Sequence, residues 1–259
     1  MVTPVEAAAM LAAALMGGVV ARLAVPTRWT VLAAGPWTVT AALAVVAARM
    51  GAYDALAVEI SSRTIIAAVA ALATGSWAGS IHLADLRGLT YRDRYLAATG
   101  STAGIILGGA VLFQADLSAL RLVWFVIAPV AAALLAAIGY FVLGLVYTDA
   151  LTELRLAGLY TLGAITLDGV TSAVVVEQLG GTQTGMVTMA LDRLAGMVGV
   201  DPYLWALLPG HVFVGMAFVG ACGWVNRQSN AVGLLFALLG SIAVLWSAAV
   251  LLVATVLLG

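Results

Sequence analysis

Long apolar runs, separated by short polar segments, repeat along the whole chain. Apolar and polar residues do not alternate within the runs, and each run is about 20 residues long, enough to cross the ~30 Å hydrocarbon core of a bilayer. Because lipid offers no hydrogen-bond partners for the backbone, runs of this length form helices. We predict eight spans, with seven as the alternative, at residues 4–25, 29–48, 64–83, 95–113, 122–146, 156–179, 203–225 and 231–258.

The fold class that follows is all-α, a polytopic transmembrane helix bundle that forms a single integral membrane domain over residues 1–259. The first run has no basic start and no small-residue cleavage site, so we expect a retained helix rather than a signal peptide. Residues 182–200 are short and amphipathic, which predicts a segment lying at the membrane surface. Three prolines, Pro36, Pro129 and Pro209, fall inside predicted spans and are expected to kink them, the last near the middle of its span.

The composition identifies lipid as the main solvent and excludes several classes of function. Hydrophobic residues make up 64% of the chain and charged residues only 9%, whereas soluble domains carry roughly 25% charged residues. All 11 basic residues are arginines, so a retinal Schiff base on lysine is excluded. A net charge of −1 offers no basic patch for nucleic acid. The single Cys222 excludes an intramolecular disulfide and a thiolate cluster for metal.

The arginines of the polar segments predict the orientation of the chain in the cell membrane. Seven arginines fall in the odd-numbered loops of the eight-span scheme and four in the even-numbered loops. Because cytoplasmic loops carry the excess of basic residues, the odd-numbered loops are expected inside and both termini outside.

The sixth predicted span contains a carboxylate, Asp168, in an otherwise apolar segment. A charge at bilayer depth is costly, so it is paired, protonated or functional. Thr171 and Ser172 lie one helical turn further on the same face, within expected reach of the carboxylate. His211 is the other ionisable group at this depth, and the two side chains are expected to form a hydrogen-bonded pair if their helices are neighbours. A purely structural anchor is the alternative for both residues.

The fourth predicted span contains glycines four residues apart, Gly100, Gly104 and Gly108. Such residues share one helix face and let a second backbone approach closely, so they predict tight helix packing within the bundle or between copies. The chain has no His-Glu-x-x-His helix, no Gly-x-Ser-x-Gly elbow and no phosphate loop. We therefore predict no metal site and no cofactor.

Two runs of the chain resemble a haloarchaeal family of polytopic membrane proteins, catalogued as domain of unknown function sixty-three. The runs are residues 167–180 (LDGVTSAVVVEQLG) and residues 34–38 (AGPWT). The resemblance implies an archaeal membrane protein, with Asp168 as a candidate site residue and no assigned substrate. The family run usually has a histidine three residues before the aspartate, where this chain has Ile165. A divergent member that has kept half of the family's polar pair is therefore expected.

Three functions remain open from the sequence. The first is a protein that binds or transports a small ligand or ion through a polar centre at Asp168, which predicts a water-accessible pocket reaching this residue. The second is a structural or accessory membrane subunit, with a packed Asp168 and a partner subunit or a second copy of the chain. The third, ranked last, is an intramembrane enzyme acting on a lipid or isoprenoid, which needs Asp168 and His211 close together.

Overall fold

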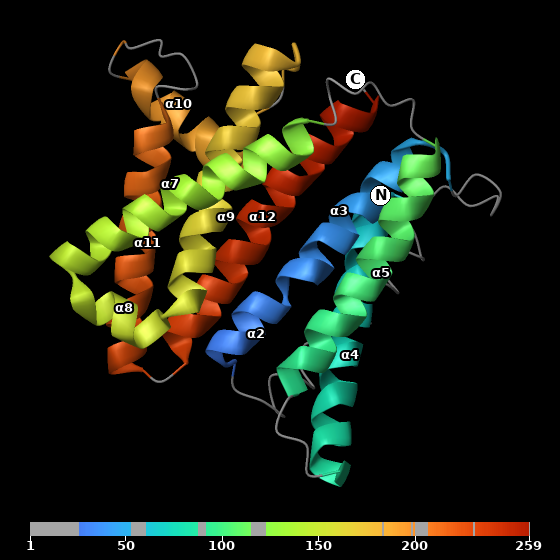
Figure 1. The fold of residues 1–259 in the computed structure, drawn as a ribbon, viewed down its shortest axis with the longest axis horizontal. Coiled ribbons are helices and arrows are strands. Elements are labelled where there is room, and N and C mark those ends of the chain that lie inside the picture. Colours follow the sequence, from blue (N-terminus) through green and yellow to red (C-terminus); the bar gives the residue numbers. More distant parts are fainter. Residues whose placement is uncertain are drawn as a thin grey trace. The chain divides into compact units, whose positions relative to one another are not determined.

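A computed structural model describes residues 26–52, 61–87, 92–114, 123–182, 184–197, 199, 207–229 and 231–258, and these ranges contain helices and no strand (Figure 1). Seven of the helices are long and apolar enough to cross a membrane. The prediction of an all-α bundle of seven to eight spans is therefore confirmed, and the chain is a multi-pass integral membrane protein. The first predicted span, residues 4–25, lies outside the described residues.

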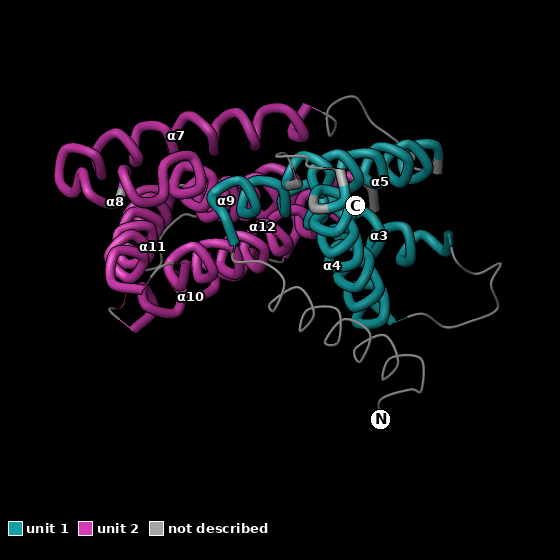
Figure 2. Tube along the Cα trace, turned by 90° about the horizontal axis from the view of Figure 1, so that it is seen from below, with its two compact units in different colours: residues 1–114 teal, residues 115–259 magenta. Residues whose placement is uncertain are grey.

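The helix contacts fall into two compact units, residues 1–114 and residues 115–259 (Figure 2). Each unit has its own set of packed helices. The single membrane domain over residues 1–259 stays a prediction.

Unit 1 contains four described helices, of which α3 is the most enclosed. α2 and α3 follow each other almost without a gap and together make one candidate span, Arg28–Arg49, 72% of which is buried. Pro36 lies in the first turn of α3, where its missing N–H leaves no hydrogen bond unmade. Pro36 therefore marks the junction of α2 and α3 within one candidate span, Arg28–Arg49, and the kink expected there stays a prediction. The helices are α2 (Arg28–Ala33), α3 (Gly35–Arg49), α4 (Ser62–Arg87) and α5 (Arg92–Gln114).

The three glycines of α5 face α3, and the space at each glycine differs. A Cβ atom added at Gly100 would lie 2.6 Å from the Trp37 ring, and one at Gly104 would lie 3.0 Å from Thr40 Oγ1. At Gly108 the nearest atom would be at an ordinary contact distance of 3.5 Å. The Trp37 indole N–H and the Thr40 hydroxyl also donate to main-chain carbonyls of α5, each over 3.0 Å. The missing side chains thus let two side chains of α3 reach the backbone of α5.

Unit 2 is built around α9, which packs against α7, α11 and α12 and is continued by a short π-helical segment, η2. The span formed by α9 and η2 is 72% buried. The elements are α7 (Trp124–Val146), α8 (Thr148–Leu154), α9 (Leu156–Ala173), η2 (Val174–Gln178), α10 (Met186–Met197), α11 (Leu208–Gln228) and α12 (Val232–Leu258).

Pro209 and Pro129 have different places in unit 2. α11 begins at Leu208 with Pro209 in its first turn, so the kink predicted near the middle of that span is wrong. His211 consequently lies near the N-terminal end of α11 rather than at its centre. Pro129 does lie inside α7.

Candidate functional site

Asp168 is fully buried in the middle of the α9–η2 span. Small and apolar residues on the faces of α9 let its neighbours approach closely, and the first residues of α10 pack against the same helix. Ionised groups are rarely buried to this extent unless partners compensate them. The Asp168 carboxylate therefore needs polar partners within unit 2.

The main partner of the Asp168 carboxylate is the N-terminus of α10. Its Oδ2 atom accepts the main-chain N–H groups of Val187, over 3.0 Å, and of Thr188, over 3.1 Å. The first N–H groups of a helix have no partner within the helix and carry the positive end of its dipole. A carboxylate at this position satisfies them and is itself stabilised in its charged form. Asp168 thus caps α10 from a neighbouring helix.

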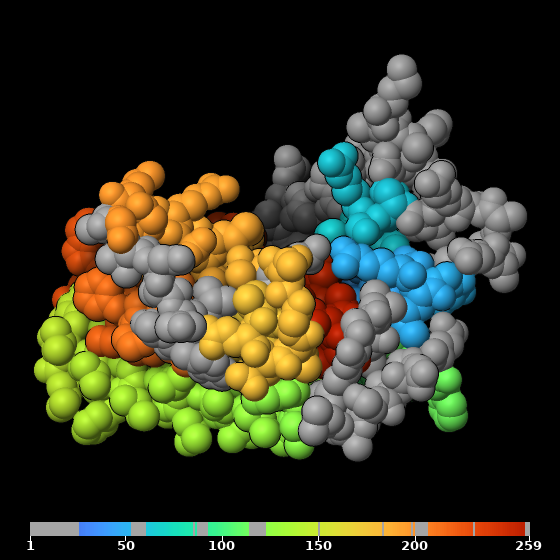
Figure 3. Space-filling view, turned by 90° about the horizontal axis from the view of Figure 1, so that it is seen from above, coloured from blue at the N-terminus to red at the C-terminus, as the bar shows by residue number. Residues whose placement is uncertain are grey.

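Two further hydroxyl groups complete this cap. The Gly185 N–H donates to Ser172 Oγ over 2.7 Å, and the Met186 N–H donates to Ser247 Oγ over 3.0 Å. All four amides from Gly185 to Thr188 therefore find acceptors on side chains of α9 and α12. The beginning of α10 is held at the depth of Asp168, while its later turns lie on the surface of unit 2 (gold to orange in Figure 3).

Glycines make the close approach at this site possible. A Cβ atom at Gly185 would lie 2.0 Å from Asp168 Oδ1, and one at Gly169 would lie 2.7 Å from the His211 ring. Real Cβ atoms do not come this close to other atoms, so no other residue fits at either position without a shift of the backbone or the site. Asp168 Oδ1 itself has no hydrogen-bond partner among the described residues.

A hydroxyl group links the carboxylate to the imidazole of His211. Thr188 Oγ1 lies 3.3 Å from Asp168 Oδ2 and 2.9 Å from His211 Nε2. The distance between Asp168 Oδ2 and His211 Nε2 is 3.9 Å. His211 Nδ1 lies 2.9 Å from the Leu207 carbonyl, which can only accept, so Nδ1 carries a hydrogen. Nε2 is left to face Thr188. The imidazole is 1% exposed.

The structure brings Asp168, Ser172 and His211 together, as the sequence predicts for neighbouring helices. Thr171 lies beside them, but its hydroxyl donates to the carbonyls of Leu167 and Asp168 in its own helix. Sequence reasoning missed Thr188, because it assigned residues 182–200 to the membrane surface. The available signal was the glycine-rich segment from Gly180 to Gly185 within an apolar region, which allows the chain to turn back into the bundle.

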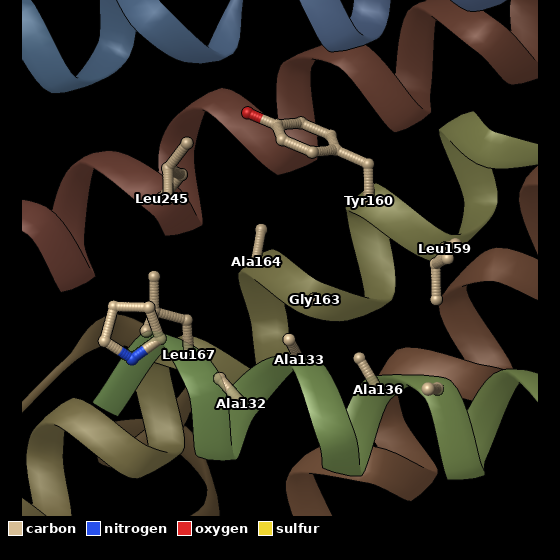
Figure 4. Close-up of a pocket in the computed structure, with 11 residues that line it drawn as sticks. Ala132, Ala133, Ala136, Leu159, Tyr160, Gly163, Ala164, Leu167 and Leu245 are labelled. Carbon is tan, nitrogen blue, oxygen red and sulfur yellow. The ribbon is translucent and has the colours of Figure 1, made fainter. Parts of the chain in front are cut away.

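An apolar cavity that includes Leu167, the neighbour of Asp168 in sequence, lies among α7, α9 and Leu245 of α12. It has a volume of about 320 Å³, and Leu167 lines it, whereas Asp168 does not. Figure 4 shows small side chains around it, with the Tyr160 ring reaching from α9 across one side. Of its lining side chains, only Tyr160 carries a polar group. The water-accessible pocket predicted at Asp168 is therefore not this cavity.

No family model, curated protein or solved structure matches the chain. The resemblance of residues 167–180 and 34–38 to the haloarchaeal family thus stays a prediction. The described residues contain no group of three His, Cys, Asp or Glu side chains that would hold a metal ion. The histidine beside Asp168 is His211 of α11. Ile165, at the position where the resembled family has a histidine, lies one turn from Asp168 in α9 and near Gly215 of α11.

Proposed function

We propose that this membrane protein binds or transports a small ligand or ion through the polar centre at Asp168, and that the ion is a proton. The observation that carries the proposal is the Thr188 hydroxyl, placed between a buried carboxylate and a buried imidazole. Ionisable groups inside membrane spans often mark proton relays, since their cost is otherwise hard to explain. A proton also needs no cavity at the tightly packed carboxylate.

The hydrogen-bond geometry supports two states that differ by one proton. With the imidazole protonated, Nε2–H donates to Thr188 Oγ1, and the hydroxyl donates onward to Asp168 Oδ2, at 3.3 Å, or to Ser172 Oγ, at 2.9 Å. With the imidazole neutral, the same hydroxyl donates to Nε2. One rotation of the Thr188 hydroxyl therefore converts one hydrogen-bonded arrangement into the other. The α10 amides remain bonded to the carboxylate in both states.

Few other charges face this pair. Among the described residues, Asp168 and His211 are the titratable side chains bonded to Thr188, and His211 is the only one in ion-pair contact with Asp168. The charged residues of α10, Asp192 and Arg193, are exposed. From α12, the group at the site is the Ser247 hydroxyl. The two protonation states are thus set within the centre itself.

The test is proton movement across vesicles that contain the purified protein and a pH-sensitive dye inside. We expect faster proton entry than in empty vesicles, and loss of the increase in Asp168→Asn and His211→Gln. Asn keeps a side-chain oxygen that can accept the α10 amides, so this variant separates titration from capping. Asp149→Asn, on the exposed surface of α8, is the control and should retain the wild-type rate. Proton entry in Asp168→Asn equal to that of the wild type would reject the proposal.

The accessory role remains the second candidate, because a fully packed carboxylate that caps a helix also fits an architectural residue. In that case Asp168→Asn should fold, bind its partner subunit and behave as the wild type in every assay. The intramembrane enzyme ranks third. Its requirement for neighbouring Asp168 and His211 is met by their 3.9 Å separation, but neither described cavity is lined by these two residues.

A further inference from the structure

A surface groove follows the contact between α7 and α9. Besides the cavity of about 320 Å³, a second one of about 430 Å³ lies next to it, and both are lined by Ala137 and Leu159. On α7 the lining extends from Pro129 to Leu145, which is about 24 Å of helix at 1.5 Å per residue. The two cavities therefore form one elongated groove, which we call the α7–α9 groove.

The α7–α9 groove is apolar and lies at the outer side of unit 2. In the first cavity the floor on α7 consists of alanines and Pro129, whereas Val130, Leu134 and Ile138 beside it are 53%, 62% and 61% exposed. Exposed aliphatic side chains on a membrane-spanning helix face hydrocarbon. A recess between such side chains has the volume of a ligand site, roughly 300–1,000 Å³, and its lining suits a hydrocarbon chain.

A basic residue, Arg155, lies next to the second cavity of the α7–α9 groove, because its carbonyl contacts the lining residue Tyr140. Leu151 lines this second cavity only, and Arg155 follows it in sequence at the junction of α8 and α9. Its backbone has φ of 50°, and its carbonyl accepts the hydroxyl of Tyr140, another lining residue, over 2.5 Å.

The acidic side chains near Arg155 are bonded to α11. Asp149 pairs with Arg227 over 2.5 Å, and Glu153 accepts the Asn226 amide over 3.0 Å. The exposed Arg155 guanidinium has no ion pair among the described residues. It is therefore available to an anion.

We propose that the α7–α9 groove binds an anionic phospholipid, with a hydrocarbon chain between α7 and α9 and the phosphate on Arg155. An apolar recess next to a basic side chain matches the chemistry of such a lipid, because one acidic headgroup joins a long chain. A helix from a second copy is a poorer fit, since the exposed side chains of α7 stand between it and the recessed floor.

Gly163 is a lining residue from which a larger side chain can be extended into the groove. A Cβ atom there would meet only the Ala136 Cβ, at 3.9 Å, and Figure 4 places Gly163 among the lining residues. Gly163→Leu should therefore occupy the space of the chain. Gly196→Leu on α10, where a Cβ meets nothing within 4 Å, is the matched control. Arg193→Gln, which removes an exposed cation from α10, is the control for Arg155→Gln.

The experiment is native mass spectrometry of the purified protein with added phosphatidylglycerol or phosphatidylcholine of identical chains. We expect retained lipid with a preference for phosphatidylglycerol. Arg155→Gln should lower phosphatidylglycerol binding about fivefold, the effect of roughly 1 kcal/mol from one basic side chain near an anionic headgroup. Gly163→Leu should lose both lipids, and the two control variants should bind as the wild type.

Other outcomes overturn the proposal. Equal binding of both lipids by the wild type, or unchanged phosphatidylglycerol binding in Gly163→Leu, would show that the retained lipid sits elsewhere. A dimer that dissociates only in Gly163→Leu would show that a second copy occupies the groove. Proton movement through Asp168 is measured separately in vesicles, so the lipid site and the proposed function stand or fail independently.

Discussion

At the scale of single residues, the contact between Gly185 and Asp168 leaves the least room for change. A Cβ atom at Gly185 would overlap the carboxylate at 2.0 Å, so Gly185→Ala has to displace either Asp168 or the first turn of α10. We expect a loss of about 1–3 kcal/mol in unfolding free energy, as for other overpacked sites. Unfolding can be followed by dye labelling of Cys222, which is buried and is the only cysteine in the chain. Gly196→Ala, with open space around it, should be neutral or slightly stabilising.

The Thr188 hydroxyl should affect both stability and proton movement. Thr188→Val keeps the shape of the side chain but leaves His211 Nε2 without its buried partner, at a cost of about 1–3 kcal/mol. Proton entry into vesicles should fall to the level of empty vesicles. Thr188→Ser retains the hydroxyl and should restore most of the rate. A Val variant with the wild-type proton rate would remove Thr188 from the relay.

At the scale of elements, the α3–α5 contact predicts a graded response to added methyl groups. The destabilisation should fall from Gly100→Ala through Gly104→Ala to Gly108→Ala, because the nearest atom lies at 2.6, 3.0 and 3.5 Å. The first change should cost about 1–3 kcal/mol and the last close to nothing. Gly109→Ala, with nothing within 4 Å, is the control. Detergent-titrated unfolding measured by circular dichroism tests the order, and equal costs at all four positions would contradict it.

The elements were largely predictable from the sequence, whereas the site was only partly so. Long apolar runs located the spans because lipid leaves the backbone no other choice. Pro209 was misplaced because a proline that begins a helix and one that kinks it look alike within an apolar run. Their depth made Asp168 and His211 candidates for a pair if their helices were neighbours, but the structure places them 3.9 Å apart with the Thr188 hydroxyl between them. The role of Thr188 could not be predicted, because Thr188 reaches the site only when the chain turns back after η2. The amphipathic pattern of residues 182–200 does not encode this turn.

At the scale of the whole molecule, the alternation of the seven described spans predicts the side of each loop. The loop between α11 and α12 should face the cytoplasm and the C-terminus should face outside, because the loops on the cytoplasmic side carry more arginines. Alkaline phosphatase fused after Leu258 should be active, and the same enzyme fused after Ser229 should be inactive. A green fluorescent protein at each position should give the opposite pattern. Activity at Ser229 with none at Leu258 would reverse the orientation.

The cap of α10 also constrains the order in which the chain can be assembled. Asp168 leaves the ribosome before the amide donors of Val187 and Thr188, which lie 19 and 20 residues later, and well before His211. At that stage α9 carries an uncompensated carboxylate, which costs about 2.5–3.5 kcal/mol at the centre of an inserting helix. We therefore expect α9 to insert poorly in a chain that stops after Gly180 and well in one that continues to Gln228. In the cell, α9 would have to wait at the insertion machinery until the following segment arrives.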